Sequence, residues 1–162
     1  MAATITIIGC TGVNAATEAT ITGLMMRSDD SVAVTKANPI TIPAGASVYS
    51  YEKWLRFKDT VAPANQCTNF KYWGPNSIPG TGMILKAGTV DTGATPVATA
   101  SSVATTQQDT NYYDTSHQLS IPGTLTSQNQ ETDYLVLQLT VANTASPGDI
   151  AQQTHNYSYD EN

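Results

Sequence analysis

The sequence predicts an all-β protein, an antiparallel β-sandwich or jelly-roll-like single domain, and three observations carry this prediction. First, only 12% of the 162 residues are charged, and the polar remainder is mainly Thr, Ser, Asn and Gln. Second, Thr is β-branched and favours strands, whereas Leu, Glu, Lys and Arg, the usual residues of exposed helix faces, are scarce. Third, apolar and polar residues alternate in short runs that turn-forming residues separate.

The N-terminal third contains two predicted strands and an interrupted region. Residues 2–8 alternate Ile with Thr, as in a half-buried strand, and Gly9 begins the break that ends this run. A second alternating run covers residues 19–27. Prolines and a glycine interrupt residues 32–46, so any strand there is expected at a sheet edge.

The central part of the chain predicts three strands. The first covers residues 48–58, and its period of two divides the side chains between two faces. One face carries Tyr51, Lys53, Leu55 and Phe57, and the other carries Glu52, Trp54, Arg56 and Lys58. Further strands are predicted at residues 67–73 and 81–89, with a turn at residues 74–80 between them.

The C-terminal part holds the clearest strand of the protein. In residues 134–142 the side chains of Leu135, Leu137, Leu139 and Val141 alternate without error, so we expect them in the core. A last strand is predicted at residues 154–160. Residues 90–127 are poor in large apolar groups, and we expect a long irregular excursion there with short edge strands.

Length and composition predict one domain over residues 1–162, because no linker or charge block divides the chain. We expect residues 1–6 to form an N-terminal arm. Terminal residues order only where something binds them, and ATIT has the β-propensity to add a strand to a neighbour's sheet. This predicts that Ala2, Ala3, Thr4, Ile5 and Thr6 lie at a contact with another subunit or with a partner protein.

Charge and cysteine content restrict the partners. A net charge of -6 with Lys+Arg at 7 leaves too few cations to bind nucleic acid or an anionic membrane. The opening MAATITIIGC lacks a basic segment and a long apolar core, which predicts an unprocessed chain made in the cytoplasm. Cys10 and Cys67 could pair if the fold brought them together, but buried thiols are the preferred interpretation.

The sequence contains no residue pattern that favours a catalytic or metal site. His117 and His155 are the only histidines, neither lies in a nucleophile motif, and His155 is expected at the surface. The metal-ligand candidates are Asp29 with Asp30, and the looser group of Asp109, Asp114 and His117. Turn formation explains these aspartates, so no metal or cofactor is predicted.

Carboxylate pairs and phosphate loops are also disfavoured. The chain has four glutamates, which we place at strand ends or on solvent-compatible faces: Glu18, Glu52, Glu131 and Glu161. The GTG at residues 80–82 lacks the helix and the lysine of a phosphate-binding loop. We therefore expect no enzyme.

Aromatic residues are the best candidates for recognition, since flat amphipathic rings serve protein interfaces and sugar platforms alike. Most of them are expected to fill the core. Trp54 and Trp73 are the first candidates for outward-facing anchors, followed by the pair Tyr112 and Tyr113.

A set of aromatic and turn patterns in residues 47–162 resembles small head proteins of tailed bacteriophages. These patterns are SYEKWLRFK, NFKYWGP, GTGMILKAGT followed by TPVATASS, and DYLVLQLTVANTASPGDIAQQTHNYSYDEN. The resemblance implies an auxiliary capsid protein, also called a decoration or cement protein, with a β-sandwich fold. It further implies a homo-oligomer, with a trimer favoured, that binds the major capsid protein on the outer capsid surface of the virion.

Two alternatives stay open. One is a tail, neck or fibre component of the virion. The other is a carbohydrate-binding adhesin in which Trp54, Trp73 or the pair Tyr112 and Tyr113 forms a stacking platform.

Overall fold

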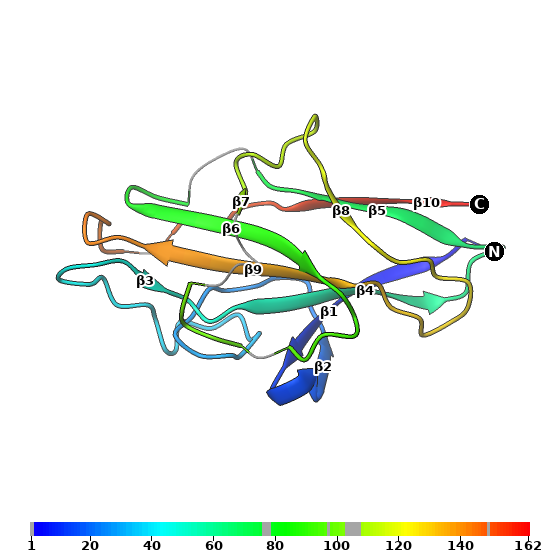
Figure 1. Cartoon of the computed structure of the whole chain (residues 1–162), viewed down its shortest axis with the longest axis horizontal. Coiled ribbons are helices and arrows are strands. Elements are labelled where there is room, and N and C mark those ends of the chain that lie inside the picture. Colours follow the sequence, from blue (N-terminus) through cyan, green and yellow to red (C-terminus); the bar gives the residue numbers. More distant parts are fainter. Residues whose placement is uncertain (1, 76–78, 97, 103–107, 149) are drawn as a thin grey trace.

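The computed structural model describes residues 2–75, 79–96, 98–102, 108–148 and 150–162, and it shows an all-β fold of antiparallel strands (Figure 1). The predicted antiparallel sandwich is confirmed, because two sheets pack face to face. The elements in chain order are β1 (Thr4–Thr11), the short 3-10 helix η1 (Val13–Ala15), β2 (Thr17–Thr20), β3 (Val48–Tyr49), β4 (Lys53–Val61), β5 (Cys67–Trp73), β6 (Met83–Val90), β7 (Gln108–Asp109), β8 (Leu119–Ile121), β9 (Tyr134–Val141) and β10 (Asn156–Glu161).

The larger sheet has the strand order β2-β1-β4-β9-β6-β7, and β3 also pairs with β9. Strand β9 lies near its middle and pairs with β6 along the full length from Tyr134 to Val141. On its other side β9 pairs with β3 and then with β4. Between these two strands the Ser50 hydroxyl accepts the Leu139 N–H at 2.9 Å, so a side chain continues the ladder where the strand is interrupted.

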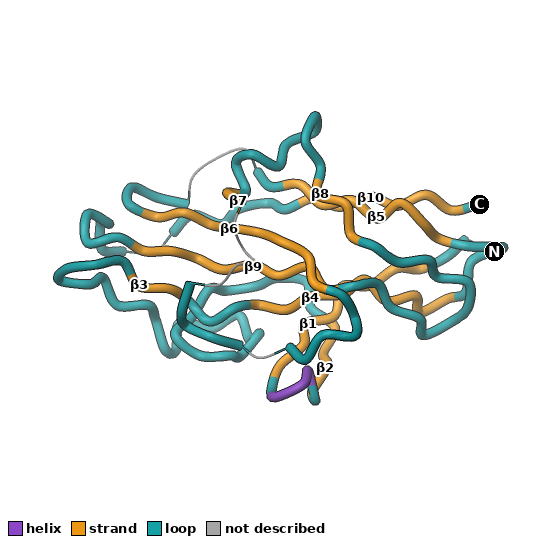
Figure 2. Tube along the Cα trace, in the orientation of Figure 1, coloured by secondary structure: helices purple, strands orange, loops and turns teal. Residues whose placement is uncertain are grey.

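The smaller sheet has the order β10-β5-β8 and covers one face of the larger sheet (Figures 1 and 2). Apolar side chains of both sheets fill the space between them. The buried members of this main core are Leu55, Phe57, Cys67, Phe70, Tyr72, Ala87, Ile121, Leu125, Leu135 and Leu137. The prediction that the leucines of β9 lie in the core is confirmed.

The opposite face of the larger sheet is also covered over part of its area. A second cluster there buries Ile8, Cys10, Trp54, Tyr134 and Val136. Further along this face the Gln138 amide donates to the carbonyl oxygens of Thr99 and Ser101, at 3.1 and 3.0 Å. Strand β9 is therefore buried on both faces, whereas its alternating sequence predicts burial of one.

The segment between β2 and β3 contains no regular strand, so the predicted strand at residues 19–27 is confirmed only to Thr20. This segment instead packs on the sheet through apolar residues that include Met26, Ile40 and Ile42. The buried Lys53 ammonium holds it by donating to the carbonyl oxygens of Asp29 and Ser31, at 2.6 and 2.8 Å.

The two ends of the chain meet at one end of the sandwich (Figure 1). The backbone N–H of Ala3 donates to the Glu161 Oε1 at 2.8 Å. The backbones of Gln66 and Asn162 also exchange hydrogen bonds, at 3.2 and 3.0 Å, which anchors the C-terminus beside the start of β5.

Candidate interaction surfaces

The expected N-terminal arm is corrected by the structure, because Thr4–Thr6 belong to the protein's own sheet. β1 pairs with β4, with Thr4 opposite Val61 and Thr6 opposite Lys58. Ala3 and Ile5 pack against the main core. The alternating sequence correctly predicts a strand here, but the strand pairs with β4 of the same chain. Among the described residues only Ala2 precedes the first contact with the core.

The hairpin of β1 and β2 projects from the body of the sandwich (Figure 1). All residues of β2 are exposed, and Val13 at the tip is 70% exposed. The Ile21 N–H donates to the Ile7 carbonyl at 2.9 Å. Because bonded and non-bonded pairs alternate in an antiparallel ladder, the N–H and C=O groups of Glu18 and Thr20 then point away from β1.

Four charged side chains form a network beside this hairpin on the outer face of the larger sheet. Lys58 Nζ lies 2.6 Å from Glu131 Oε1 and 3.5 Å from Glu18 Oε2. Arg56 pairs with the same two glutamates, and its guanidinium carbon lies 4.1 Å from the centre of the Tyr134 ring. The hydrogen bond from Lys58 to Glu131 raises the pKa of Lys58. This network fixes β2 to β4.

Trp54 is not a surface anchor, which corrects the prediction for this residue. Its side chain is only 6% exposed and packs with Tyr134 in the second cluster. The indole N–H donates to Glu52 Oε2 at 2.9 Å. Glu52 is itself 2% exposed rather than on a solvent-compatible face, and burial raises the pKa of its carboxyl group.

The other predicted aromatic candidates come together at the end of the β10–β5 ladder that is far from the chain termini. Trp73 ends β5 and lies opposite Asn156 in β10. Beside them is a hollow of about 240 Å³, which we call the Trp73 hollow; Trp73, Gly74, Pro75, Asp114, Thr115 and Asn156 line it.

Tyr112 and Tyr113 lie on the loop that carries Asp114, with ring centres 5.6 Å apart. Tyr112 is 51% exposed and lies 4.9 Å from the His117 ring, whereas Tyr113 is half-buried against Tyr72. The loop is attached to β5 through the Gly74 N–H, which donates to the Tyr113 carbonyl at 2.9 Å. A Cβ at Gly74 would lie 2.7 Å from the Thr110 carbonyl oxygen, so this attachment requires glycine.

Side-chain caps hold this loop in shape. Asp114 Oδ1 accepts the backbone N–H groups of Ser116 and His117, at 2.7 and 2.8 Å. These hydrogen bonds, the Ser116 bond first, lower the pKa of the exposed Asp114 carboxyl. Asp109 Oδ1 accepts the Asn111 N–H in the same way at 2.9 Å. The turn-forming role predicted for these aspartates is confirmed.

His155, which precedes Asn156 in the chain, is half-buried, and this corrects the expectation of a surface position. Its Nδ1 lies 2.7 Å from the Tyr72 hydroxyl, and the two rings stack with centres 5.8 Å apart. Burial lowers the pKa of His155 and raises that of Tyr72. Both groups therefore favour their neutral forms, and the imidazole tautomer decides which of the two atoms donates the hydrogen bond.

Both cysteines are buried and unpaired, as the preferred interpretation predicts: Cys10 belongs to the second cluster and Cys67 to the main core. Across the described ranges no three metal-ligating side chains gather as a metal site. Asp29 instead accepts from Arg27 at 2.9 Å and from Asn38 at 2.6 Å, which are bonds that shape its loop.

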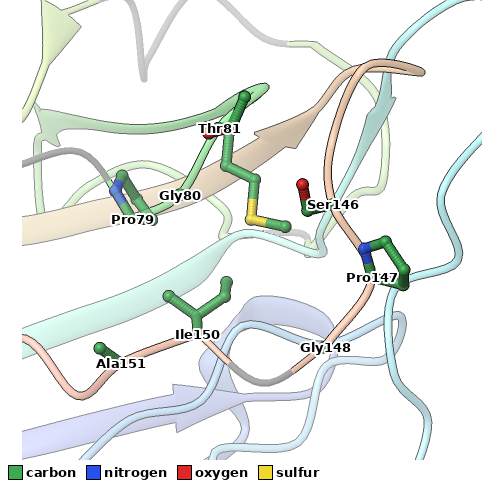
Figure 3. A pocket seen from close by; sticks show the side chains of 9 residues that line it. Pro79, Gly80, Thr81, Ser146, Pro147, Gly148, Ile150 and Ala151 are labelled. Atoms are coloured by element: carbon green, nitrogen blue, oxygen red, sulfur yellow. The ribbon is translucent and has the colours of Figure 1, made fainter.

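A second, smaller hollow lies between the turn before β6 and the loop after β9. Figure 3 shows Pro79, Pro147 and Ile150 around this space, whose volume is about 150 Å³. Ile150 is 39% exposed. The walls are mainly small or apolar residues, so this hollow offers few groups for recognition.

In the part of the chain that the structure describes, no helix is long and apolar enough to cross a membrane. Comparisons of the chain with protein-family models, with curated proteins and with solved structures find no match. The structure thus places the chain in the class of all-β antiparallel sandwich proteins.

Proposed function

We propose that the chain is a non-enzymatic structural protein of a virion, which binds the major capsid protein on the outer capsid surface and stabilises the shell. The observation that carries this proposal is the open edge of β2. A four-residue strand with every residue exposed offers unpaired backbone donors and acceptors, and such an edge can accept a strand of another chain.

The anchoring of the hairpin supports this role. Glu18 of β2 is held by Arg56 and Lys58 of β4, so the edge is presented by a rigid sheet. A pre-organised edge loses less conformational entropy on binding than a flexible arm would. We therefore assign to β2 the contact with a neighbouring chain that the sequence suggests for residues 2–6.

The use of the buried charged groups supports it further. Lys53 and Arg27 donate to backbone carbonyls of the loop between β2 and β3, and Glu52 accepts from Trp54. These side chains hold loops and rings in place, as a protein that braces a shell requires. The resemblance to decoration proteins of tailed bacteriophages, with a homo-oligomer and a favoured trimer, points to the same role.

Stabilisation would act by mass action. A protein that binds the assembled shell better than dissociated subunits stabilises the shell by that difference in binding free energy. Many modest contacts add up across a symmetric lattice through multivalency. Particles without the protein should keep their architecture but rupture at a lower temperature, and added purified protein should restore the resistance.

The test uses Thr20→Pro, which removes an outward N–H of the β2 edge, and Thr20→Ala as the matched control that keeps it. Purified variants are added to particles that lack the protein, and the bound copies are counted after thermal unfolding has shown both to be folded. Thr20→Pro should lower occupancy and Thr20→Ala should not. Equal occupancy refutes the role of this edge, and cryo-EM density on the tail, neck or fibres instead of the capsid refutes the capsid assignment.

A further inference from the structure

The Trp73 hollow combines an aromatic wall with polar groups from three separate segments. Trp73 and Asn156 stand opposite each other on β5 and β10, so their side chains lie on the same face of the smaller sheet. Asp114 reaches the hollow from the loop that follows β7. Sequence positions far apart thus place an indole, an amide and a carboxylate around one space of about 240 Å³.

The polar groups of this hollow have unused hydrogen-bond donors and acceptors. Within the described residues Asp114 uses only Oδ1 in hydrogen bonds, and Oδ2 has no partner. The Trp73 indole N–H and the Asn156 side-chain amide have none either, whereas the indole N–H of the other tryptophan is bonded to Glu52. The hollow therefore offers two kinds of donor and a charged acceptor to a ligand.

We propose that the Trp73 hollow binds one residue of a neutral carbohydrate, with the apolar face of the sugar ring on the Trp73 indole and its hydroxyl groups bonded to Asp114 and Asn156. A pyranose has one flat apolar face and a rim of hydroxyls that both donate and accept. This matches an amphipathic ring beside an unshared carboxylate oxygen and an amide. The exposed Tyr112 on the same loop provides a ring for a neighbouring sugar residue.

Charge and size define the class of carbohydrate. Asp114 places a negative charge on the hollow and the chain carries a net charge of -6, so acidic sugars are repelled. The hollow is smaller than the roughly 300–1,000 Å³ of sites for drug-sized ligands, which restricts it to a single sugar residue. Such a site binds weakly alone and gains strength when many copies are displayed together.

The site is independent of the β2 edge. The caps on Asp114 and the bond from Gly74 to Tyr113 shape the hollow without any contribution from β2. A variant of the hollow should therefore leave occupancy on particles unchanged. Failure of one proposal does not touch the other.

The test is an NMR titration of the full chain, which contains 2 tryptophans and hence two indole N–H signals. The probes are the methyl glycosides of glucose, galactose and mannose, N-acetylglucosamine, and N-acetylneuraminic acid as the acidic sugar. Each is added up to about 50 mM, where a site with a millimolar Kd is close to saturation. The Trp73 signal should shift in a saturable way with at least one neutral sugar, while the buried Trp54 signal stays fixed as an internal reference.

Asp114→Asn and Asn156→Ala should each weaken this binding by about 5-fold or more, the loss expected for one hydrogen bond near 1 kcal/mol. The asparagine can still cap Ser116 and His117, so the loop keeps its shape. Asp91→Asn is the matched control, since Asp91 Oδ1 caps the Gly93 N–H in another exposed turn. A Trp73 signal unchanged by every neutral sugar, equal binding by the hollow variants and the control, or a response to N-acetylneuraminic acid alone would overturn the proposal.

Discussion

Trp54 meets Tyr134 edge to face, with ring centres 5.1 Å apart and planes inclined by 74°. The two rings come from neighbouring strands of the larger sheet, β4 and β9. Arg56 lies over the Tyr134 ring as well, with its guanidinium carbon 4.1 Å from the ring centre. This stack closes the outer face of the sheet where no second sheet covers it.

Trp54→Ala should therefore lower the free energy of unfolding by about 3–5 kcal/mol, because a large buried ring and its edge-to-face contact are lost. Urea denaturation monitored by circular dichroism measures this change. Val13→Ala, at a side chain that is 70% exposed, is the control and should change stability by less than about 0.5 kcal/mol. A stability loss for Trp54→Ala as small as that of the control would contradict the burial of Trp54.

Leu137→Ala should cost about 2–5 kcal/mol, since Leu137 is 3% exposed in the main core and opposite Lys53 and Ala87 on the neighbouring strands. Ile84→Ala on β6 is a matched control, because Ile84 is 41% exposed. Its loss should be clearly smaller in the same denaturation experiment. Equal losses would mean that the two faces of the sheet are assigned wrongly.

Stability should fall as the pH is lowered below about 6.5 because of His155. Burial lowers the pKa of His155 from 6.5, so the unfolded chain takes up the proton first as the pH falls. Protonation also places a charge on a half-buried imidazole that stacks on the Tyr72 ring. His155→Gln should flatten the pH dependence of the melting temperature in this window. A wild-type slope that survives in His155→Gln would contradict this origin.

The two thiols should be unreactive in the folded protein and both free in the unfolded chain. Cys67 is fully buried, and burial, with a contribution from the Glu18 charge, raises the pKa of Cys10 to about 12. Thiolate is the reactive form of cysteine. An aromatic disulfide reagent should therefore react with neither thiol of the folded protein at neutral pH, and with both thiols of the protein unfolded in urea without reductant. If neither thiol reacts in urea, the two cysteines are joined in a disulfide and this prediction is wrong.

Much of the fold could be predicted because the alternation of apolar and polar residues indicates both where a strand lies and which side chains share a face. The bounds of β5 and the core position of Leu135 and Leu137 follow directly from it. Alternation does not say which faces another layer covers. Trp54 and Trp73 therefore looked alike in the sequence, yet Trp54 is buried within the second cluster and Trp73 lines a hollow at a sheet end.

The candidate site was predictable only in part for a similar reason. Trp73, Tyr112 and Tyr113 stand out by residue type, and the structure gathers them at one end of the molecule. Asn156 carries no signal of its own, because its role comes from the register of β10 with β5. The open edge of β2 was missed because strand partners depend on contacts distant in sequence.

The hydrogen bond from the Ala3 N–H to Glu161 has a practical consequence for engineering. Ends that lie this close can be joined by a short flexible peptide, and new ends can be opened elsewhere, such as in the exposed turn at residues 91–93. A circular permutant of this kind should fold. Both ends of the chain also lie far from the Trp73 hollow, so cargo fused to either of them would be displayed without obstructing it.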